Sequence, residues 1–183
     1  MSYSMNFGIC CEGFPSLITL SLILAKIIAG HATEYPVFSP NSAQKAIDGN
    51  NYNKNVGSCS HTNLDEKNVV HYWQIDFGRN IVVKSVTVYN RNDCCWGRLS
   101  YVDIVVFNNG RITKCGTTGD MTYIGHREIA CSDLILGSIV RVQHTSQQVG
   151  VPITLCEVYV FGREFQAEWD FSRKDRHECD MID

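Results

Sequence analysis

The sequence predicts an all-β fold, an antiparallel β-sandwich or jelly roll. Short runs rich in β-branched and aromatic residues recur along the chain, and Gly- and Asn-rich turns separate them. No stretch sustains a helical spacing of apolar residues over the roughly 11–18 positions that a helix signal needs. The 183 residues are 44% hydrophobic and 19% charged, which suits one globular domain. Strands at this spacing are typical of a sandwich.

The strand predictions rest on alternation. In residues 71–77, Trp73, Ile75 and Phe77 fall on one face, and residues 81–89 are rich in β-branched side chains. Three further runs have strand character, namely 101–107, 138–143 and 153–161. The turns that separate these runs are predicted at 78–80, 108–110 and 116–120.

Charge divides the chain into a neutral body and an acidic tail. The net charge is −3, and residues 163–183 account for it with 4 basic and 7 acidic side chains. No block of Lys and Arg occurs, so we expect no nucleic-acid partner. We therefore divide the chain into an N-terminal segment (1–30), one domain (31–162) and a charged C-terminal tail (163–183).

The N-terminal segment resembles a secretory signal. Residues 16–29 are apolar, but Lys26 interrupts them and they are too short to cross a bilayer. We expect a secreted, extracellular protein without membrane insertion. The alternatives are a buried first strand or an atypical N-terminal segment.

The cysteines also favour an oxidising compartment. There are nine, and no Cys-x-x-Cys pair suggests a metal site. Because nine is odd, at least one thiol is free, pairs with another chain, or is removed with a cleaved segment. Cys10 and Cys11 would leave with a signal peptide, and Cys179 lies in the acidic tail.

Two polar loops hold candidate ligand-binding residues. Asp48, Asn50 and Ser58 offer oxygen atoms of the kind that calcium prefers, although these residues alone favour a polar turn in which Asp and Asn bond their own backbone. His61 follows Cys59, and a disulfide at that cysteine would fix the position of the imidazole.

The loop 90–98 concentrates rigid hydrogen-bond donors. It holds Arg91, Asp93, the adjacent pair Cys94 and Cys95, and Arg98. Guanidinium groups donate in fixed geometry, and an oxidised Cys94–Cys95 pair would add a flat apolar surface. A neutral polyhydroxyl compound, a sugar, fits such a surface. Glycoside hydrolysis would need two flanking carboxylates and a thiol enzyme would need a thiolate beside a base, so we expect no enzyme.

These residues resemble the F-type lectins, or fucolectins. The segment His61 … Arg91-x-Asp93-x4-Arg98, with the adjacent cysteines inside it, is similar to the sugar-binding signature of that family. Five other segments follow in the family's order, at residues 46–50, 57–59, 73–76, 85–88 and 155–158. The resemblance covers roughly residues 29–161.

The resemblance implies a discoidin-like jelly roll that binds L-fucose at its loop end. It implies that His61, Arg91 and Arg98 donate hydrogen bonds to the sugar and that Asp93 orients the arginines. The sugar ring would pack on a Cys94–Cys95 disulfide. The aromatic residues that would cover the fucose methyl group vary in the family, and the candidates here are Tyr35, Phe38, Tyr52 and Trp96.

A structural calcium ion and two further disulfides are also implied. The ion would be held by side chains of Asp48, Asn50, Ser58 and Glu157 and by carbonyl groups of Lys45 and Cys156. The implied disulfides are Cys59–Cys156 and Cys115–Cys131.

Two departures from the family pattern affect the site. The stretch between His61 and Arg91 is about three residues longer than usual, within 63–71, so His71 is an alternative for the role of His61. The loop 48–58 is one residue short.

We expect fucosylated glycans as partners, a homo-oligomer such as a trimer for avidity, and a role in innate immunity. The alternative is a discoidin-like adhesion module for protein or phospholipid.

Overall fold

The computed structural model describes residues 25–27, 30–39, 42–51 and 56–166. Most of the predicted signal segment and of the charged tail lies outside these ranges, as do Cys10, Cys11, Tyr52 and Cys179. Within the ranges, no helix has the length and apolar character that a membrane crossing requires.

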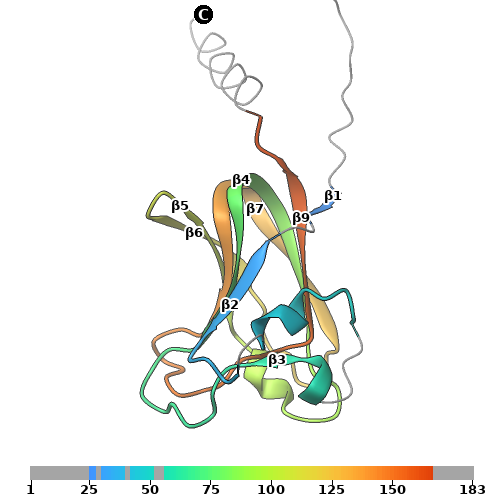
Figure 1. Cartoon of the computed structure of the whole chain (residues 1–183), viewed down its shortest axis with the longest axis vertical. Helices are drawn as coiled ribbons and strands as arrows, with labels where there is room; N and C mark the ends of the chain where they lie inside the picture. Colours follow the sequence, from blue (N-terminus) through green and yellow to red (C-terminus); the bar gives the residue numbers. More distant parts are fainter. Residues whose placement is uncertain (1–24, 28–29, 40–41, 52–55, 167–183) are drawn as a thin grey trace, which may run out of the picture.

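The described chain is built from antiparallel strands and three short 3-10 helices, as predicted (Figure 1). The strands are β1 (Ala25–Ile27), β2 (His31–Tyr35), β3 (Ser60–His61), β4 (Tyr72–Tyr89), β5 (Asp103–Asn108), β6 (Arg111–Thr117), β7 (His126–Gln143), β8 (Thr154–Leu155) and β9 (Glu157–Glu164). The helices are η1 (Ala43–Ala46), η2 (Val56–Ser58) and η3 (Trp96–Leu99). Strand β1 lies inside the segment 1–30 that the sequence set apart, and it pairs with β9.

Two long strands shape the molecule. β4 and β7 each span 18 residues and pair along most of their length. The register shifts between Asp76 and Ile81, where Gly78 has a φ of 64° that glycine adopts readily. The first half of β4 pairs with β2 and the second half with β9, so the sheet curls into two layers. The two strands predicted at 71–77 and 81–89 are therefore one bent strand.

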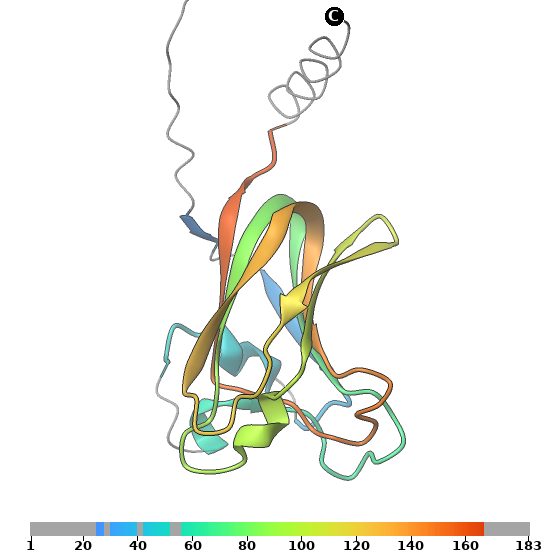
Figure 2. The same cartoon turned by 180° about the vertical axis from the view of Figure 1, so that it is seen from behind.

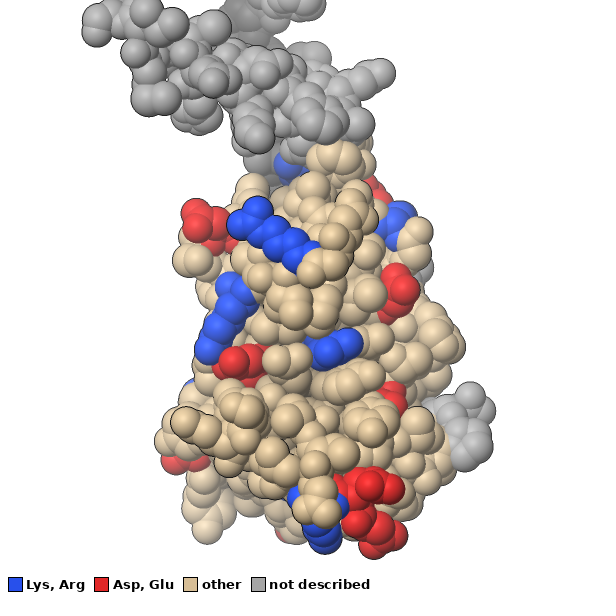
Figure 3. Space-filling model, turned by 90° about the vertical axis from the view of Figure 1, so that its left-hand side faces the viewer, with Lys and Arg blue, Asp and Glu red and all other residues tan. Residues whose placement is uncertain are grey.

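The core lies between these layers. Trp73, Ile75 and Phe77 are all buried, as their alternation predicted. The indole N–H of Trp73 donates to the carbonyl of Ala43 at 2.9 Å, which fixes η1 against the core. Figure 3 views one face, on which positive and negative side chains are interspersed over a mostly uncharged surface.

The long strands deliver their connecting loops to one end of the sandwich. The short helices and β3 gather at the lower end of Figure 1, and the same cluster is seen from behind in Figure 2. β3 pairs with β8 in a separate two-stranded sheet. Residues far apart in the sequence thus meet at this end.

The three disulfides implied by the resemblance are all present. They join Cys59 to Cys156, Cys94 to Cys95 and Cys115 to Cys131. Cys59 precedes β3 and Cys156 lies between β8 and β9, so their bond closes the loop end.

Candidate functional site

Arg91 and Asp93 form a forked ion pair on the loop after β4. Nε of Arg91 donates to Oδ1 of Asp93 at 2.5 Å and Nη2 donates to Oδ2 at 2.7 Å. The hydrogen bonds from Arg91 lower the pKa of Asp93 to about 2, so this carboxylate stays ionised. Such a bidentate pair fixes the plane of the guanidinium. The orienting role that the resemblance implies for Asp93 has this geometric basis.

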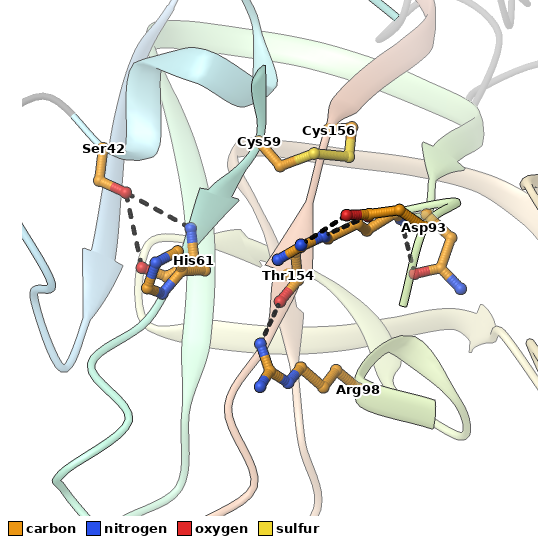
Figure 4. Close-up of a disulfide and its surroundings, with 9 residues drawn as sticks. Ser42, Cys59, His61, Asp93, Arg98, Thr154 and Cys156 are labelled. Carbon is orange, nitrogen blue, oxygen red and sulfur yellow. Dashed lines mark hydrogen bonds and ion pairs between the residues drawn. A yellow bond between two sulfur atoms is a disulfide. The ribbon is translucent and has the colours of Figure 1, made fainter. Parts of the chain in front are cut away.

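Arg98 lies on helix η3, and its side chain extends toward Thr154 of β8. Its Nη1 donates to Oγ1 of Thr154 at 3.4 Å, and Figure 4 shows its side chain reaching toward that residue. Burial, followed by repulsion from Arg91, lowers the pKa of Arg98. Because two guanidinium groups repel each other unless an electron-rich partner lies between them, this arrangement favours a ligand with oxygen acceptors.

His61 lies on the other side of Thr154. The two residues are paired across β3 and β8, and both are buried. The backbone of His61 is further tied to Ser42, whose hydroxyl lies 3.4 Å from the N–H and 3.5 Å from the carbonyl (Figure 4). The structure therefore brings His61 and Arg98 together around one threonine.

The hydrogen bond of His61 determines what its ring can offer. Nδ1 lies 3.1 Å from the carbonyl oxygen of Thr62, which can only accept. Nδ1 therefore carries the proton, and Nε2 of the neutral ring is an acceptor. In a protonated ring Nε2 would also be a donor, which is the role that the resemblance implies for His61. A hydroxyl group could donate to Nε2 while it accepts from a nearby arginine.

Phe38, one of the four aromatic candidates, contacts His61. Its ring lies 3.8 Å from that of His61, centroid to centroid, and the side chain is 51% exposed. Buried Glu34 connects Phe38 with Ser60, the residue before His61. Its carboxylate accepts from the backbone N–H of Phe38 at 3.2 Å and from the hydroxyl of Ser60 at 2.7 Å. Phe38 thus offers an apolar wall beside His61. Tyr35 instead stacks on Tyr72 at 5.6 Å.

Residues 63–71, where the chain is longer than in the family, form a loop that ends at His71. This ring is fully buried, with Nδ1 at 2.6 Å from Oγ1 of Thr62 and Nε2 at 2.8 Å from the carbonyl of Glu66. Both ring nitrogens are therefore engaged inside the protein. His71 has no ring edge left for a ligand, so the alternative role suggested for it is not supported.

The vicinal disulfide lies between the two arginines in the chain. Cys94 and Cys95 are half-buried, and Cys95 has a left-handed φ of 65°. The carbonyl of Cys95 accepts from the N–H of Arg98 at 3.0 Å. The disulfide thus lies along the chain between the Arg91–Asp93 pair and the first residue of η3.

A second polar cluster joins the loop after η1 to the start of β9. Glu157 is 1% exposed, and its Oε2 accepts from the N–H of Gly49 at 3.0 Å. Burial raises the pKa of Glu157 to about 7; the charge of Lys26 opposes this rise and the nearby charge of Asp48 adds to it. A small pocket of about 120 Å³ opens here, lined by Asp48, Glu157 and Lys26 among others.

The residues of this cluster fit a calcium ion. A buried carboxylate close to a second one is stabilised by a cation, and the implied set contains only oxygen donors. The described part of the chain holds no group of three or more His, Cys, Asp or Glu side chains suited to a metal. A cation here would therefore rely on Asp48 and Glu157 together with amide, hydroxyl and carbonyl oxygens from Asn50, Ser58, Lys45 and Cys156.

Two residues of the site were not predicted from the sequence. Thr154 is fully buried between His61 and Arg98, and Asn90 is fully buried beside Arg91. Each is a polar residue next to an apolar strand run, which is a weak signal. Nothing in the local sequence indicates which loop such a residue will contact.

Comparison with known proteins places the chain in a family. A family model described as "NedA-like, galactose-binding domain" matches residues 45–142. Fucolectin-3 of Anguilla japonica is 34% identical over 124 residues, which are 64% of this chain and 65% of that protein. Fucolectin of Anguilla anguilla is 31% identical over 125 residues, 64% of this chain and 75% of that protein. The chain spans slightly less than two thirds of the length of the Anguilla japonica relative.

Solved structures agree with this placement. An F-lectin (fucolectin) from striped bass (Morone saxatilis) serum superposes with a TM-score of 0.64 and 30% identity, over 74% of this chain and 47% of that one. The lectin domain of lectinolysin in complex with Lewis B antigen gives a TM-score of 0.61 and 26% identity, over 73% of this chain and 93% of that one. The chain belongs to the family of NedA-like galactose-binding domains and to the fucolectins, or F-type lectins.

Proposed function

We propose that this chain is a secreted, calcium-containing lectin that binds L-fucose and fucosylated glycans without transforming them. The observation that carries the proposal is the convergence of Arg91, Arg98 and His61 at the loop end, with Thr154 between the last two. The relatives named fucolectins support this choice of sugar.

The hydrogen-bonding groups of the site suit vicinal hydroxyls. The Asp93 pair uses Nε and Nη2 of Arg91, and Nη1 carries two further N–H donors. A hydroxyl can accept from an arginine and donate to Nε2 of His61 at once. Phe38 offers an apolar contact for the C5 methyl group that distinguishes fucose from most hexoses. A sugar that leaves these groups unpaired is penalised by their desolvation.

Calcium would have a structural role in this proposal. When bound, the ion would add positive charge between Asp48 and Glu157 and so connect the loop after η1 with β9. Because Cys156 precedes Glu157 and bonds Cys59, the same point of the chain holds β3, which carries His61. The cation would thus stabilise the frame on which the sugar site rests.

Secretion and multivalency complete the proposal. Three disulfides in the described residues suit an oxidising, extracellular environment. A single shallow site binds a small sugar weakly, so a homo-oligomer, for instance a trimer, would supply avidity for glycan-coated surfaces. Recognition of microbial or host glycans in innate immunity is the biological role that we propose.

Single-residue variants test the site. We expect Arg91→Ala and Arg98→Ala to reduce binding of L-fucose in calorimetric titration below detection, while circular dichroism stays unchanged. Arg79→Ala is the matched control, because Arg79 forms an equally forked pair with Glu164 at 2.7 and 2.8 Å. Arg79 lies ten residues before the end of β4, roughly 30 Å along an extended strand from the site.

The outcome separates the sugar site from other functions. Fucose binding that survives in both site variants would contradict the assignment. If the wild-type protein binds phospholipid vesicles and free fucose does not inhibit this binding, an adhesion module would be favoured instead.

A further inference from the structure

An aromatic pair stands beside the proposed fucose site. Tyr123 is 82% exposed, and its ring lies 5.7 Å from that of half-buried Trp96 at an interplanar angle of 54°. Trp96 directly follows Cys95 and begins η3, the helix that carries Arg98. The pair is therefore continuous along the chain with the vicinal disulfide.

A single buried side chain ties this pair to the sugar loop. Nδ2 of Asn90 donates to the carbonyl of Trp96 at 3.1 Å and to that of Met121 at 3.3 Å. Oδ1 of the same amide accepts from the N–H of Arg91 at 2.9 Å. The backbone N–H of Asn90 donates to Gly125 at 2.7 Å. One residue thus positions Arg91, the start of η3 and the turn that carries Tyr123.

The turn around Tyr123 is well fixed by its own hydrogen bonds. The N–H of Met121 donates to the hydroxyl of Ser100 at 2.9 Å. Asp120 accepts from the N–H of Thr122 at 2.9 Å and from its hydroxyl at 2.7 Å. Tyr123 itself has a φ of 60°, a left-handed conformation that is costly for a bulky residue. The exposed ring of Tyr123 is therefore held in place by its turn and by Trp96, and it is available for a contact outside the chain.

We propose that Trp96 and Tyr123 form a second subsite, which binds the hexose or N-acetylhexosamine ring joined to fucose in a glycan. The inference rests on the proposed function of the neighbouring site. The C–H face of a pyranose packs on an aromatic ring, and the position next to the vicinal disulfide lets one oligosaccharide span both subsites. Fucose held by Arg91 and Arg98 would extend its neighbouring sugar over Tyr123.

Paired titrations of monosaccharide and oligosaccharide test this subsite. The probes are methyl α-L-fucoside and three trisaccharides in which fucose is linked α1,2, α1,3 or α1,4. We expect the wild-type protein to bind at least one trisaccharide more tightly than the fucoside. Tyr123→Ala should weaken that trisaccharide about 3- to 10-fold, as expected for one aromatic contact, and leave the fucoside within twofold. Tyr123→Phe should retain both affinities because it keeps the ring.

A matched control is available in Tyr101. This residue is also an exposed tyrosine with a left-handed φ, of 56°, but it has no ring contact with Trp96, so we expect Tyr101→Ala to change neither affinity. Equal weakening of fucoside and trisaccharide by Tyr123→Ala, or no preferential loss for any trisaccharide, would overturn the subsite alone. A wild-type protein that binds no fucoside would instead overturn the proposed function and the subsite with it.

Discussion

The buried carboxyl group of Glu157 is expected to make the metal-free protein less stable as pH rises. Burial raises its pKa to about 7 in the folded chain, against an ordinary value of 4.5. Between these two values the folded state holds a proton that the unfolded state has released, so the free energy of unfolding falls with increasing pH. At 1.36 kcal/mol per pH unit, the difference of about 2.5 corresponds to about 3 kcal/mol.

Glu157→Gln isolates this contribution. The amide oxygen of glutamine can still accept from the N–H of Gly49, but the side chain never ionises. Urea unfolding in EDTA would be measured for both proteins from pH 4.5 to pH 8.5. We expect the wild type to lose about 3 kcal/mol relative to the variant over this range. Calcium added at pH 8 should restore stability to the wild type and much less to the variant.

The two proteins differ at this side chain alone, so the difference between their unfolding free energies reports Glu157 and its coupling to Asp48 and Lys26. A difference that stays within about 0.5 kcal/mol across the range would refute the reasoning. It would mean that Lys26, which favours the charged form, compensates for burial.

Three other predictions concern the site and its frame. Asp93→Asn should weaken fucose binding roughly tenfold in calorimetry, because Arg91 loses the charged partner that fixes its plane; an unchanged affinity would contradict this. Replacing both Cys59 and Cys156 by alanine should lower the free energy of unfolding by about 4–5 kcal/mol in urea, as the loop-closure model gives for their separation of 97 residues; a loss below about 1 kcal/mol would argue against it. Phe38→Ala should lower the affinity for L-fucose several-fold more than that for D-arabinose, which lacks the methyl group, and equal losses would exclude a methyl contact.

The fold class could be predicted from the sequence because apolar alternation reports directly on burial. Trp73, Ile75 and Phe77 share one buried face as their spacing indicates. Strand β6 and the first two thirds of β7 were not predicted, since both are rich in exposed polar side chains. Edge and solvent-facing strands carry no such pattern. That 71–77 and 81–89 form one bent strand depends on pairing with distant segments, which local sequence does not encode.

The residues of the candidate site could be named from their spacing and their resemblance to a family, but their neighbours could not. Thr154 meets His61 through pairing of β3 with β8, across more than 90 positions of sequence. Asn90 contacts Met121, 31 positions away, through a hydrogen bond from its side-chain amide. The proton on Nδ1 of His61 follows from the carbonyl of Thr62, a contact that only the folded backbone defines.

The most direct test of fucose binding is a calorimetric titration of the oxidised wild-type protein in calcium, first with L-fucose and then with D-glucose. We predict saturable heat with fucose and none with glucose, since glucose lacks both the methyl group and the hydroxyl arrangement of fucose. Absence of heat with fucose, from protein shown to be folded by circular dichroism, would contradict the account.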